Sequence, residues 1–341
     1  MADLPGERAP DHETARWAPD RNLGLELVRI TEAAALAAAR LMGRGDPLSA
    51  EEAAARGMRV MLSTLPMDGL VVIGEGEKNN AAVLYHGEVI GQGRGPAVDI
   101  AVDAIDGKRL TAEGMNGALS AAALADRGSM FDAGPCRFME KIAVGSEACD
   151  VIDITAPVAE NLRRIAAAKH CRIPDLTVVV VDRERHGRLV AEAREAGARV
   201  KIILAGDVGG AITAARVGTG VDALIGIGGT AEGVLAACAI KCLGGAIQGR
   251  LAPRSDAERE ETIAAGYDLD RVLTTDDLVT GDDIFFAATG ITDGDLLRGV
   301  RYEGEMALTQ SIAMRSRSGT VRMIDAEHQR EKLMLYSSIE Y

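Results

Sequence analysis

The sequence is poor in aromatic side chains, which make up 3% of its 341 residues. Ala, Val, Ile, Leu and Met must therefore fill the interior of a chain that is 47% hydrophobic and long enough for two domains or one large two-lobed unit. The sequence also lacks a run of about 18 apolar residues, so no segment reads as a transmembrane helix. Residues 1–22 are polar and rich in proline without an apolar stretch, so we expect a disordered tail and not a signal peptide.

The cysteines indicate the cellular compartment, and the net charge indicates which partners are expected. Five scattered cysteines form no Cys-x-x-Cys pair, which favours reduced thiols in a cytoplasmic protein over a disulfide framework. Asp and Glu number 51 against 38 Lys and Arg, giving a net charge of -13. Such a chain repels nucleic acid and anionic membranes, so neither is an expected partner. It would also repel a phosphorylated substrate unless metal ions or local Arg and Lys residues reverse the field at the site.

The pattern of apolar residues changes near residue 155. Before it, two helices precede strands separated by Gly-rich turns, and we expect Ser49 to cap the second helix. After it, strands alternate with helices, which predicts a parallel sheet with crossover helices. We predict four regions: a disordered tail (1–22), an N-terminal metal-binding α+β lobe (23–155), an α/β lobe with substrate-binding loops (156–300), and C-terminal strands that pack back on the domain (301–341).

The elements of these regions follow from the same pattern. Strands are expected at 70–73, 98–105, 118–125, 138–144, 176–181, 200–204, 223–227, 283–289, 307–314 and 319–325. Helices are expected at 23–42, 185–196, 208–215 and 232–243, besides the one capped by Ser49.

Acidic residues gather where two of these strands end. Glu75 follows one strand, and Asp103 and Asp106 end another, ahead of a turn opened by Gly107. Carboxylates beside continuous Val and Ile are partly desolvated, which is costly unless a cation neutralises them. Hard oxygen ligands at strand ends suit Mg²⁺ or Mn²⁺, and Glu232, in the first turn of a later helix, could add to them. A solvated turn is the simpler interpretation of one such Asp, whereas the cluster favours metal.

Seven short motifs occur in order along residues 23–330 without large gaps. They are Gly43-Arg44-Gly45-Asp46, Ile73-Gly74-Glu75-Gly76-Glu77, Val98-Asp99-Ile100-Ala101-Val102-Asp103, Met139-Glu140-Lys141, Gly206-Asp207-Val208, Gly226-Ile227-Gly228-Gly229 with Glu232-Gly233, and Ala288-Thr289-Gly290-Ile291-Thr292. Together they resemble the class II (GlpX-type) fructose-1,6-bisphosphatases. The segment from Asp103 to Lys108 is also similar to the metal-binding turn of the wider inositol-monophosphatase-like sugar phosphatase superfamily.

The resemblance implies a fold of the α+β or α/β class, a layered sugar-phosphatase fold with two sheet-containing lobes. It implies a metal-dependent phosphatase that uses Mg²⁺ or Mn²⁺ to hydrolyse a phosphomonoester of a sugar bisphosphate. The expected substrate is fructose 1,6-bisphosphate, cleaved at its C1 phosphate, with sedoheptulose 1,7-bisphosphate as a second substrate in some members. A homodimer or homotetramer is the expected assembly.

The resemblance also assigns roles by position. The metal carboxylates would be Glu75, Asp103 and Glu232, with Asp106 beside them and Glu51 as a secondary candidate, although an acid near a helix start more often complements the helix dipole. The expected catalytic residues are Glu75, Asp106 and Lys108. The expected substrate-binding residues include Gly107, Lys108 and Phe138. Arg183, Arg185 and His186 would bind the distal phosphate, unless they are only surface charge. Gly206 and Asp207 would bind sugar hydroxyls.

The sequence departs from the family at the expected site and not in the scaffold motifs. Lys108 stands where the family has a threonine whose hydroxyl helps to orient the attacking water. The ammonium of Lys108 could displace a metal ion by pairing with Asp106 or Glu75, bind the transferred phosphate, or point to solvent. We expect it to replace part of the metal charge, so that activity on fructose 1,6-bisphosphate is weak or absent. The other departures are Pro47 for lysine, Glu51 for Asp, Ala104 for proline, Phe138 for tyrosine, and Lys78-Asn79-Asn80 for acidic residues.

Two other interpretations remain open at this point. Gly226-Ile227-Gly228-Gly229-Thr230-Ala231 has the form of a dinucleotide-binding motif between a strand and a helix, but Glu232 would stand where a pyrophosphate binds. Alternatively, the same fold serves another sugar-phosphate reaction, non-hydrolytic and using Lys108, or is catalytically silent. The charged run 254–261 is expected to be a solvated helix face.

Overall fold

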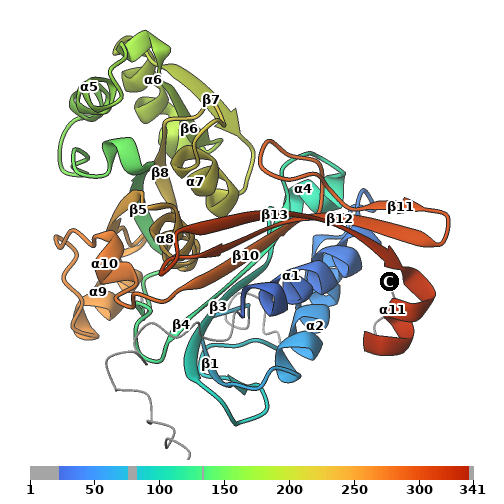
Figure 1. Ribbon diagram of the computed structural model, residues 1–341. Coiled ribbons are helices and arrows are strands. Elements are labelled where there is room, and N and C mark those ends of the chain that lie inside the picture. Colours follow the sequence, from blue (N-terminus) through green and yellow to red (C-terminus); the bar gives the residue numbers. More distant parts are fainter. Residues whose placement is uncertain (1–22, 76–82, 133, 338–341) are drawn as a thin grey trace, which may run out of the picture.

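The computed structural model describes residues 23–75, 83–132 and 134–337, which form two β-sheets and the helices that cover them (Figure 1). The expected tail at 1–22 and the segment Lys78-Asn79-Asn80 lie outside the described residues. None of the described helices has the length and apolar character needed to cross a bilayer.

The first sheet has eight strands and is built from the beginning and the end of the chain. Its order is β11-β12-β10-β4-β3-β1-β2, with β13 paired to β12, and β1 and β3 are its parallel pair. The strands are β1 (Asp68–Ile73), β2 (Val89–Ile90), β3 (Ala97–Asp106), β4 (Leu119–Asp126), β10 (Phe285–Gly290), β11 (Arg301–Glu303), β12 (Met306–Arg315) and β13 (Thr320–Gln329).

The second sheet has five strands in the order β7-β6-β8-β5-β9. Strand β6 runs parallel to β7 and β8, which confirms the predicted strand–helix alternation there. The boundary expected near residue 155 needs correction, because β5 already pairs with β8 and β9. The strands are β5 (Phe138–Val144), β6 (Thr177–Val181), β7 (Arg199–Ile203), β8 (Ala223–Gly229) and β9 (Ala246–Leu251).

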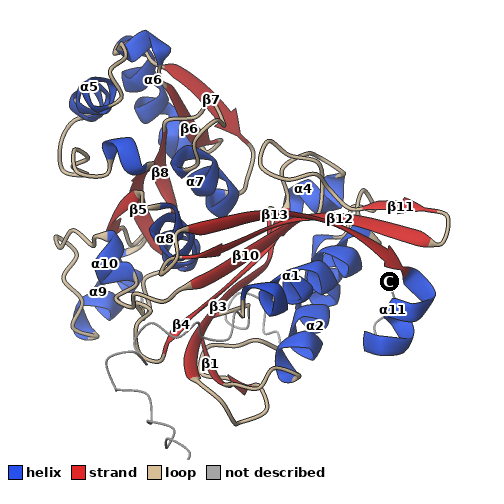
Figure 2. Cartoon of the chain, viewed as in Figure 1, coloured by secondary structure: helices blue, strands red, loops and turns tan. Residues whose placement is uncertain are grey.

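The sheets and helices alternate in five layers (Figure 2). One core packs α1 (Gly24–Ala39) and α2 (Pro47–Ser63) on the first sheet. A second core places α7 (Asp207–Ala215) and α8 (Thr230–Leu243) between the two sheets. A third covers the outer face of the second sheet with α5 (Val158–Ala168) and α6 (Gly187–Glu195). This layered α+β arrangement with two sheets is the predicted fold class.

Local sequence explains where several elements begin. Helix α2 is capped by Asp46 and not by Ser49, because the Asp46 carboxylate accepts a hydrogen bond from the Ser49 backbone N–H at 3.0 Å, with Pro47 in the first turn. The remaining helices are α4 (Lys108–Glu113), α9 (Asp256–Ala264), α10 (Thr275–Leu278) and α11 (Arg330–Ser337), and short 3₁₀ turns lie at Ser146–Ala148, Ile173–Asp175 and Glu184–His186.

A buried acid in α1 makes stability depend on pH. Glu32 accepts a hydrogen bond from the Thr309 hydroxyl at 3.1 Å, and burial raises its pKa to about 7. Because this pKa lies above that of the unfolded chain, the folded state loses stability as pH rises from about 4.5 to 7. Glu32→Gln should therefore stabilise the protein at pH 8 by about 1–3 kcal/mol and much less at pH 5.

Urea unfolding of both proteins at the two pH values measures the difference. Glu303→Gln, an exposed position on β11, is the matched control and should change stability by less than about 0.5 kcal/mol at either pH. An equal gain for Glu32→Gln at pH 5 and pH 8 would contradict the assignment.

Candidate active site

The acidic end of β3 is shaped by a register shift. Asp103 pairs with Ala121 of β4, but Asp106 pairs with Leu119, so β3 carries one extra residue between them. In a regular strand, side chains three residues apart face opposite sides of the sheet, and a bulge of this kind re-aims one of them. Both Asp103 and Asp106 consequently line one cavity beyond the end of the strand.

Glu75 lies just beyond the end of β1 and is buried. Its Oε1 accepts a hydrogen bond from the Ala104 backbone N–H, within the bulge of β3, at 2.7 Å. Its other oxygen lies 3.3 Å from the Lys108 Nζ. The bulged backbone therefore holds one oxygen of Glu75, and the other contacts a lysine.

Lys108 joins two acids from different elements. Its ammonium forms ion pairs with Glu51 of α2 and with Glu75. Glu51 is buried and lies beyond the first turn of its helix, so its charge does not serve the helix dipole. Of the three outcomes expected for Lys108, the structure supports pairing with carboxylates, with Glu51 joining Glu75 in place of Asp106.

The electrostatics follow from this burial. Burial and the adjacent Glu75 raise the pKa of Glu51 to about 7, although Lys108 opposes the shift. Burial lowers the pKa of Lys108, but Glu75, Glu51 and Asp103 outweigh that effect and raise it above its usual value. Lys108 is therefore a cation at neutral pH, and a neutral lysine base has no support here.

Asp106 is held from the opposite lobe. Its Oδ2 accepts a hydrogen bond from the Gly209 backbone N–H, in the first turn of α7, at 2.8 Å. Burial raises its pKa to about 7, and the nearby Asp207 and Glu232 act in the same direction. This contact ties the end of β3 to the helix layer between the sheets.

A second buried lysine organises the wall made by β5 and β8. Lys141 Nζ lies 2.7 Å from Asp207 Oδ2 and donates to the Gly229 carbonyl at 2.9 Å. A Cβ at Gly228 would lie 1.5 Å from Asp207 Oδ2, so only glycine leaves room for this pair. The role expected for Asp207 in binding sugar hydroxyls thus competes with an ion pair to Lys141.

Arginines form the other side of the site. The guanidinium carbons of Arg254 and Arg185 lie 4.9 Å and 5.7 Å from the centre of the Phe138 ring. Burial and the like charges of Arg254 and Arg183 lower the pKa of Arg185. Two guanidiniums over an aromatic face, with Arg183 near them, form a natural anion site. Phe138 has no hydroxyl to offer and contributes its ring instead.

These groups line one cavity of about 410 Å³ between the two lobes. It brings together most of the predicted site residues: Asp103, Asp106, Gly107, Lys108, Phe138, Arg183, Arg185, Gly206, Asp207 and Glu232. Glu51 and Glu75 lie behind Lys108 and do not line it. The cavity is lined by both acidic and basic side chains, which suits a phosphorylated molecule bound together with a cation.

His186 needs a different role from the one expected. Its Nδ1 lies 2.7 Å from the Val181 carbonyl, and its Nε2 lies 2.8 Å from the Ile227 backbone nitrogen, which donates to it. Both ring nitrogens are therefore engaged by backbone groups, and the side chain is buried. His186 joins β6 to β8 and has no donor left for a phosphate.

The predicted carboxylate set divides into two parts. Over the described part of the chain, no group of three or more His, Cys, Asp and Glu residues is arranged to hold a metal ion. Asp103 and Glu232 nevertheless both face the cavity, and Mg²⁺ is commonly held by one or two carboxylates plus water and substrate phosphate. Asp103 and Glu232 are thus the carboxylates of the predicted set, besides Asp106, that line the cavity, whereas Lys108 contacts the Glu51 and Glu75 carboxylates.

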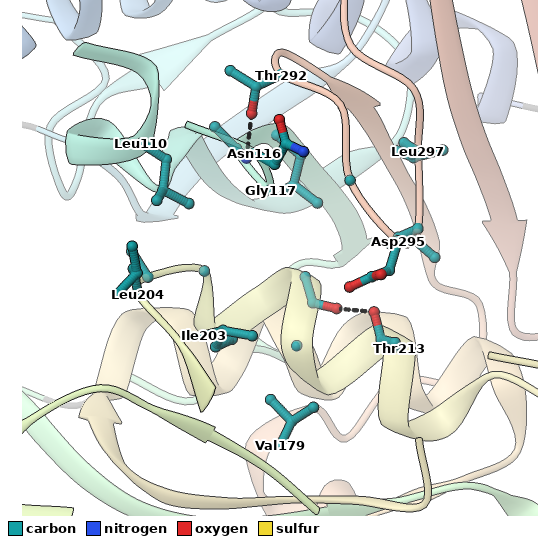
Figure 3. A pocket seen from close by; sticks show the side chains of 18 of the residues that line it. Leu110, Asn116, Gly117, Val179, Ile203, Leu204, Thr213, Thr292, Asp295 and Leu297 are labelled. Atoms are coloured by element: carbon teal, nitrogen blue, oxygen red, sulfur yellow. Dashed lines mark hydrogen bonds between the residues drawn. The ribbon is translucent and has the colours of Figure 1, made fainter. Parts of the chain in front are cut away.

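A second cavity, of about 450 Å³, lies beside the first and shares Ala205 and Gly206 with it (Figure 3). Its hydroxyl groups already have partners: Thr213 donates to the Gly209 carbonyl at 2.7 Å, and Thr292 accepts from the Ala118 N–H at 2.9 Å. Much of the remaining wall is apolar, including Leu110, Val179, Ile203, Leu204 and Leu297. Its lysine, Lys201, is paired with Asp295 at 2.6 Å, and no arginine in the described part of the chain lines it, so it offers a phosphate fewer positive groups than the first cavity.

The dinucleotide interpretation conflicts with the structure. Gly226, Gly228 and Gly229 lie within β8, which pairs antiparallel with β5. A Cβ at Gly229 would lie 1.7 Å from the Glu232 Oε2, so the glycines make room for acidic side chains of the chain itself. A pyrophosphate would meet these acids and not a helix N-terminus open to anions.

Layered sheets with acidic and basic groups around a cavity between the lobes define a phosphatase of the sugar-phosphatase type. The family model for "Bacterial fructose-1,6-bisphosphatase, glpX-encoded" matches residues 21–328, and the chain belongs to this family of class II fructose-1,6-bisphosphatases. It is 44% identical over 322 residues to "Fructose-1,6-bisphosphatase class 2" of Haemophilus influenzae, covering 91% of this chain and 96% of that protein.

Two cyanobacterial relatives carry a double name. The chain is 41% and 40% identical to "D-fructose 1,6-bisphosphatase class 2/sedoheptulose 1,7-bisphosphatase" of two Synechococcus strains, each over 337 residues. Each match covers 92% of this chain and 97% of the relative. Similarity therefore extends over both lobes and over the whole site.

Three residues of the site were missed by sequence reasoning. Arg109 and Arg254 line the cavity, and Lys141 forms the ion pair in its wall. Arg254 was assigned to a solvated helix face, yet it precedes α9 and reaches Phe138. Lys141 lies in the Met139-Glu140-Lys141 motif, and a lysine in a strand whose other residues, apart from Glu140, are apolar was a usable signal.

Removal of one partner of the buried Lys141–Asp207 pair should destabilise the protein, because the other charge stays buried without its counterion. Lys141→Met should lower the free energy of unfolding by about 2–4 kcal/mol, because the Asp207 carboxylate would lose its ammonium partner. The double variant Lys141→Met, Asp207→Asn should recover part of that loss. Urea unfolding in a double-mutant cycle measures the coupling.

The exposed Arg188–Glu192 pair on α6 is the matched control. Arg188→Met should cost less than about 0.5 kcal/mol. If Lys141→Met also lowered the free energy of unfolding by less than about 0.5 kcal/mol, the buried pair would not stabilise the wall of the site.

Proposed function

We propose that the protein hydrolyses one phosphate of a sugar bisphosphate of the fructose 1,6-bisphosphate type, with Mg²⁺ or Mn²⁺ as the metal ion. The observation that carries this proposal is one cavity lined by both carboxylates and arginines. A sugar bisphosphate uses both kinds of group, because carboxylates can hold a cation for the phosphate that is cleaved and arginines can bind the other phosphate. Family membership supports the same reaction class, and the names of the Synechococcus relatives make sedoheptulose 1,7-bisphosphate the second substrate to test.

In this proposal the distal phosphate is bound by the arginines. Arg185 and Arg254 are positioned by the Phe138 ring, and two nitrogens of Arg185 donate to the Ile227 carbonyl at 2.6 and 3.1 Å. These contacts orient the guanidinium before substrate arrives, which lowers the entropic cost of binding. Arg183 adds a third positive charge.

In the same proposal, the phosphate that is cleaved lies beside the carboxylates that line the cavity. Asp103 and Glu232 would hold the metal ion, which, when bound, supplies positive charge to the phosphate oxygens and favours water as a nucleophile. The water oxygen forms a bond to phosphorus, and the bond from phosphorus to the sugar oxygen breaks. The sugar oxygen keeps the electron pair and takes a proton from solvent, while Asp106, fixed by the Gly209 N–H, would accept a proton from the attacking water and return it to solvent.

The free thiols and the family resemblance support two further expectations. All five cysteines are unpaired, which agrees with a reducing compartment, and we propose a cytoplasmic location on that ground. We also propose a homodimer or homotetramer, on the family resemblance alone. Size-exclusion chromatography with light scattering tests the assembly.

Phosphate release from fructose 1,6-bisphosphate tests the activity. It should require Mg²⁺ or Mn²⁺ and stop with EDTA, and Asp103→Asn should lower kcat at least about 100-fold because a metal carboxylate is lost. Mass spectrometry of the product separates the rival reaction. A product of unchanged mass would mean rearrangement and not hydrolysis, and no product from either bisphosphate would support a silent protein.

Arg185→Ala tests the distal phosphate site. Loss of a charge-assisted contact should raise KM for the bisphosphate about 10- to 100-fold, with a smaller change in kcat. Arg188→Ala, one turn away and exposed, is the matched control and should leave KM within about twofold. Equal KM values for the two variants would place the distal phosphate elsewhere.

A further inference from the structure

We propose that the Lys108 ammonium is a built-in cation that neutralises Glu51 and Glu75, so that the site takes up one divalent ion and not two. The inference deepens the proposed function and rests on it, because it concerns the number of ions that serve the same phosphate. A two-ion clamp is the common arrangement for displacement at phosphorus. Here, one of the two positive centres is supplied by the chain.

Geometry supports this assignment. Glu51 comes from α2 and Glu75 from the end of β1, 24 positions apart, yet both carboxylates contact one ammonium. Both acids are buried, at 5% and 2% exposure, where an unneutralised carboxylate costs several kcal/mol, on the order of a broken buried ion pair. A divalent ion between the same oxygens would meet the Lys108 charge at contact distance. Ion and ammonium therefore exclude one another.

The backbone fixes Lys108 in this position. It is the first residue of α4 and follows Gly107, whose φ of 103° is in the left-handed region that glycine favours. Leu110, two residues further along, is buried in the core that includes α1 and α2. The start of α4 is thus anchored, and the lysine side chain, about a quarter exposed, enters the site from a set direction.

The remaining acids face a different space. Asp103 and Glu232 line the cavity with the arginines, whereas Glu51 and Glu75 do not line it and are separated from it by Lys108. The cavity side gives access to water and substrate phosphate, which Mg²⁺ requires as ligands. One ion is therefore expected at Asp103 and Glu232.

Counting bound Mn²⁺ tests the inference without any measurement of activity. The protein is stripped with EDTA, exchanged into buffer and titrated with MnCl₂, with free Mn²⁺ read from its electron paramagnetic resonance signal and heat read by calorimetry. We expect one ion per chain for the wild type. Lys108→Thr and Lys108→Met should each bind two ions, because Glu51 and Glu75 lose their cation and attract a metal ion instead.

Two controls separate charge from disruption. Lys108→Arg keeps a cation between the acids and should still bind one ion. Arg188→Thr replaces an exposed arginine of α6 that pairs with Glu192, outside this cavity, and should also leave one ion. Thermal unfolding without metal confirms that each variant is folded.

The outcomes are distinguishable. Two ions in the wild type, or one ion in both Lys108→Thr and Lys108→Met, would overturn this inference and leave the proposed phosphatase intact. No ion in the wild type would overturn the metal site at Asp103 and Glu232 as well, and with it the proposed metal-dependent reaction.

Discussion

Buried carboxylates between the two lobes must be neutralised, and the arrangement of the site depends on how this is done. Lys108 neutralises Glu51 and Glu75, and Lys141 pairs with Asp207. Burial of each ammonium costs free energy and offsets part of the attraction within its pair, so neither pair is a simple gain in stability. What the pairs provide is a defined position for each acid. Asp103 and Glu232 line the cavity, where the proposed metal ion and substrate would bind.

The layered fold brings opposite charges to one cavity. The first sheet contributes acids at the end of β3, where a bulge turns Asp103 and Asp106 to one side. The second sheet contributes Phe138, and the loops around it contribute the arginines. Helix α7 lies between the sheets, and its Gly209 N–H holds Asp106. A substrate with two phosphates can therefore span the two lobes.

Several features of this architecture were predictable because they are local. Runs of Val and Ile bounded by turn-forming residues placed β3 and β6 within a residue or two, with glycine at both ends of β3 and Pro174 and aspartates around β6. Other features depended on distant partners. Strand β9 was missed, since its residues Ala246–Leu251 alternate weakly and are held by pairing with β5. His186 looked like a phosphate ligand next to Arg185, yet backbone groups of β6 and β8 engage both its nitrogens.

The sequence by itself determined the family, the alternation of strands and helices, and the chemical types at the site, because motifs and hydrophobic periodicity are properties of neighbouring residues. It also showed that Lys108 stands where the family has a threonine. Only the tertiary structure decided which acids the lysine meets, since α2, β1 and α4 are brought together by core packing that no short segment encodes. The same packing separated Glu51 and Glu75 from the cavity and left Asp103 and Glu232 open to it.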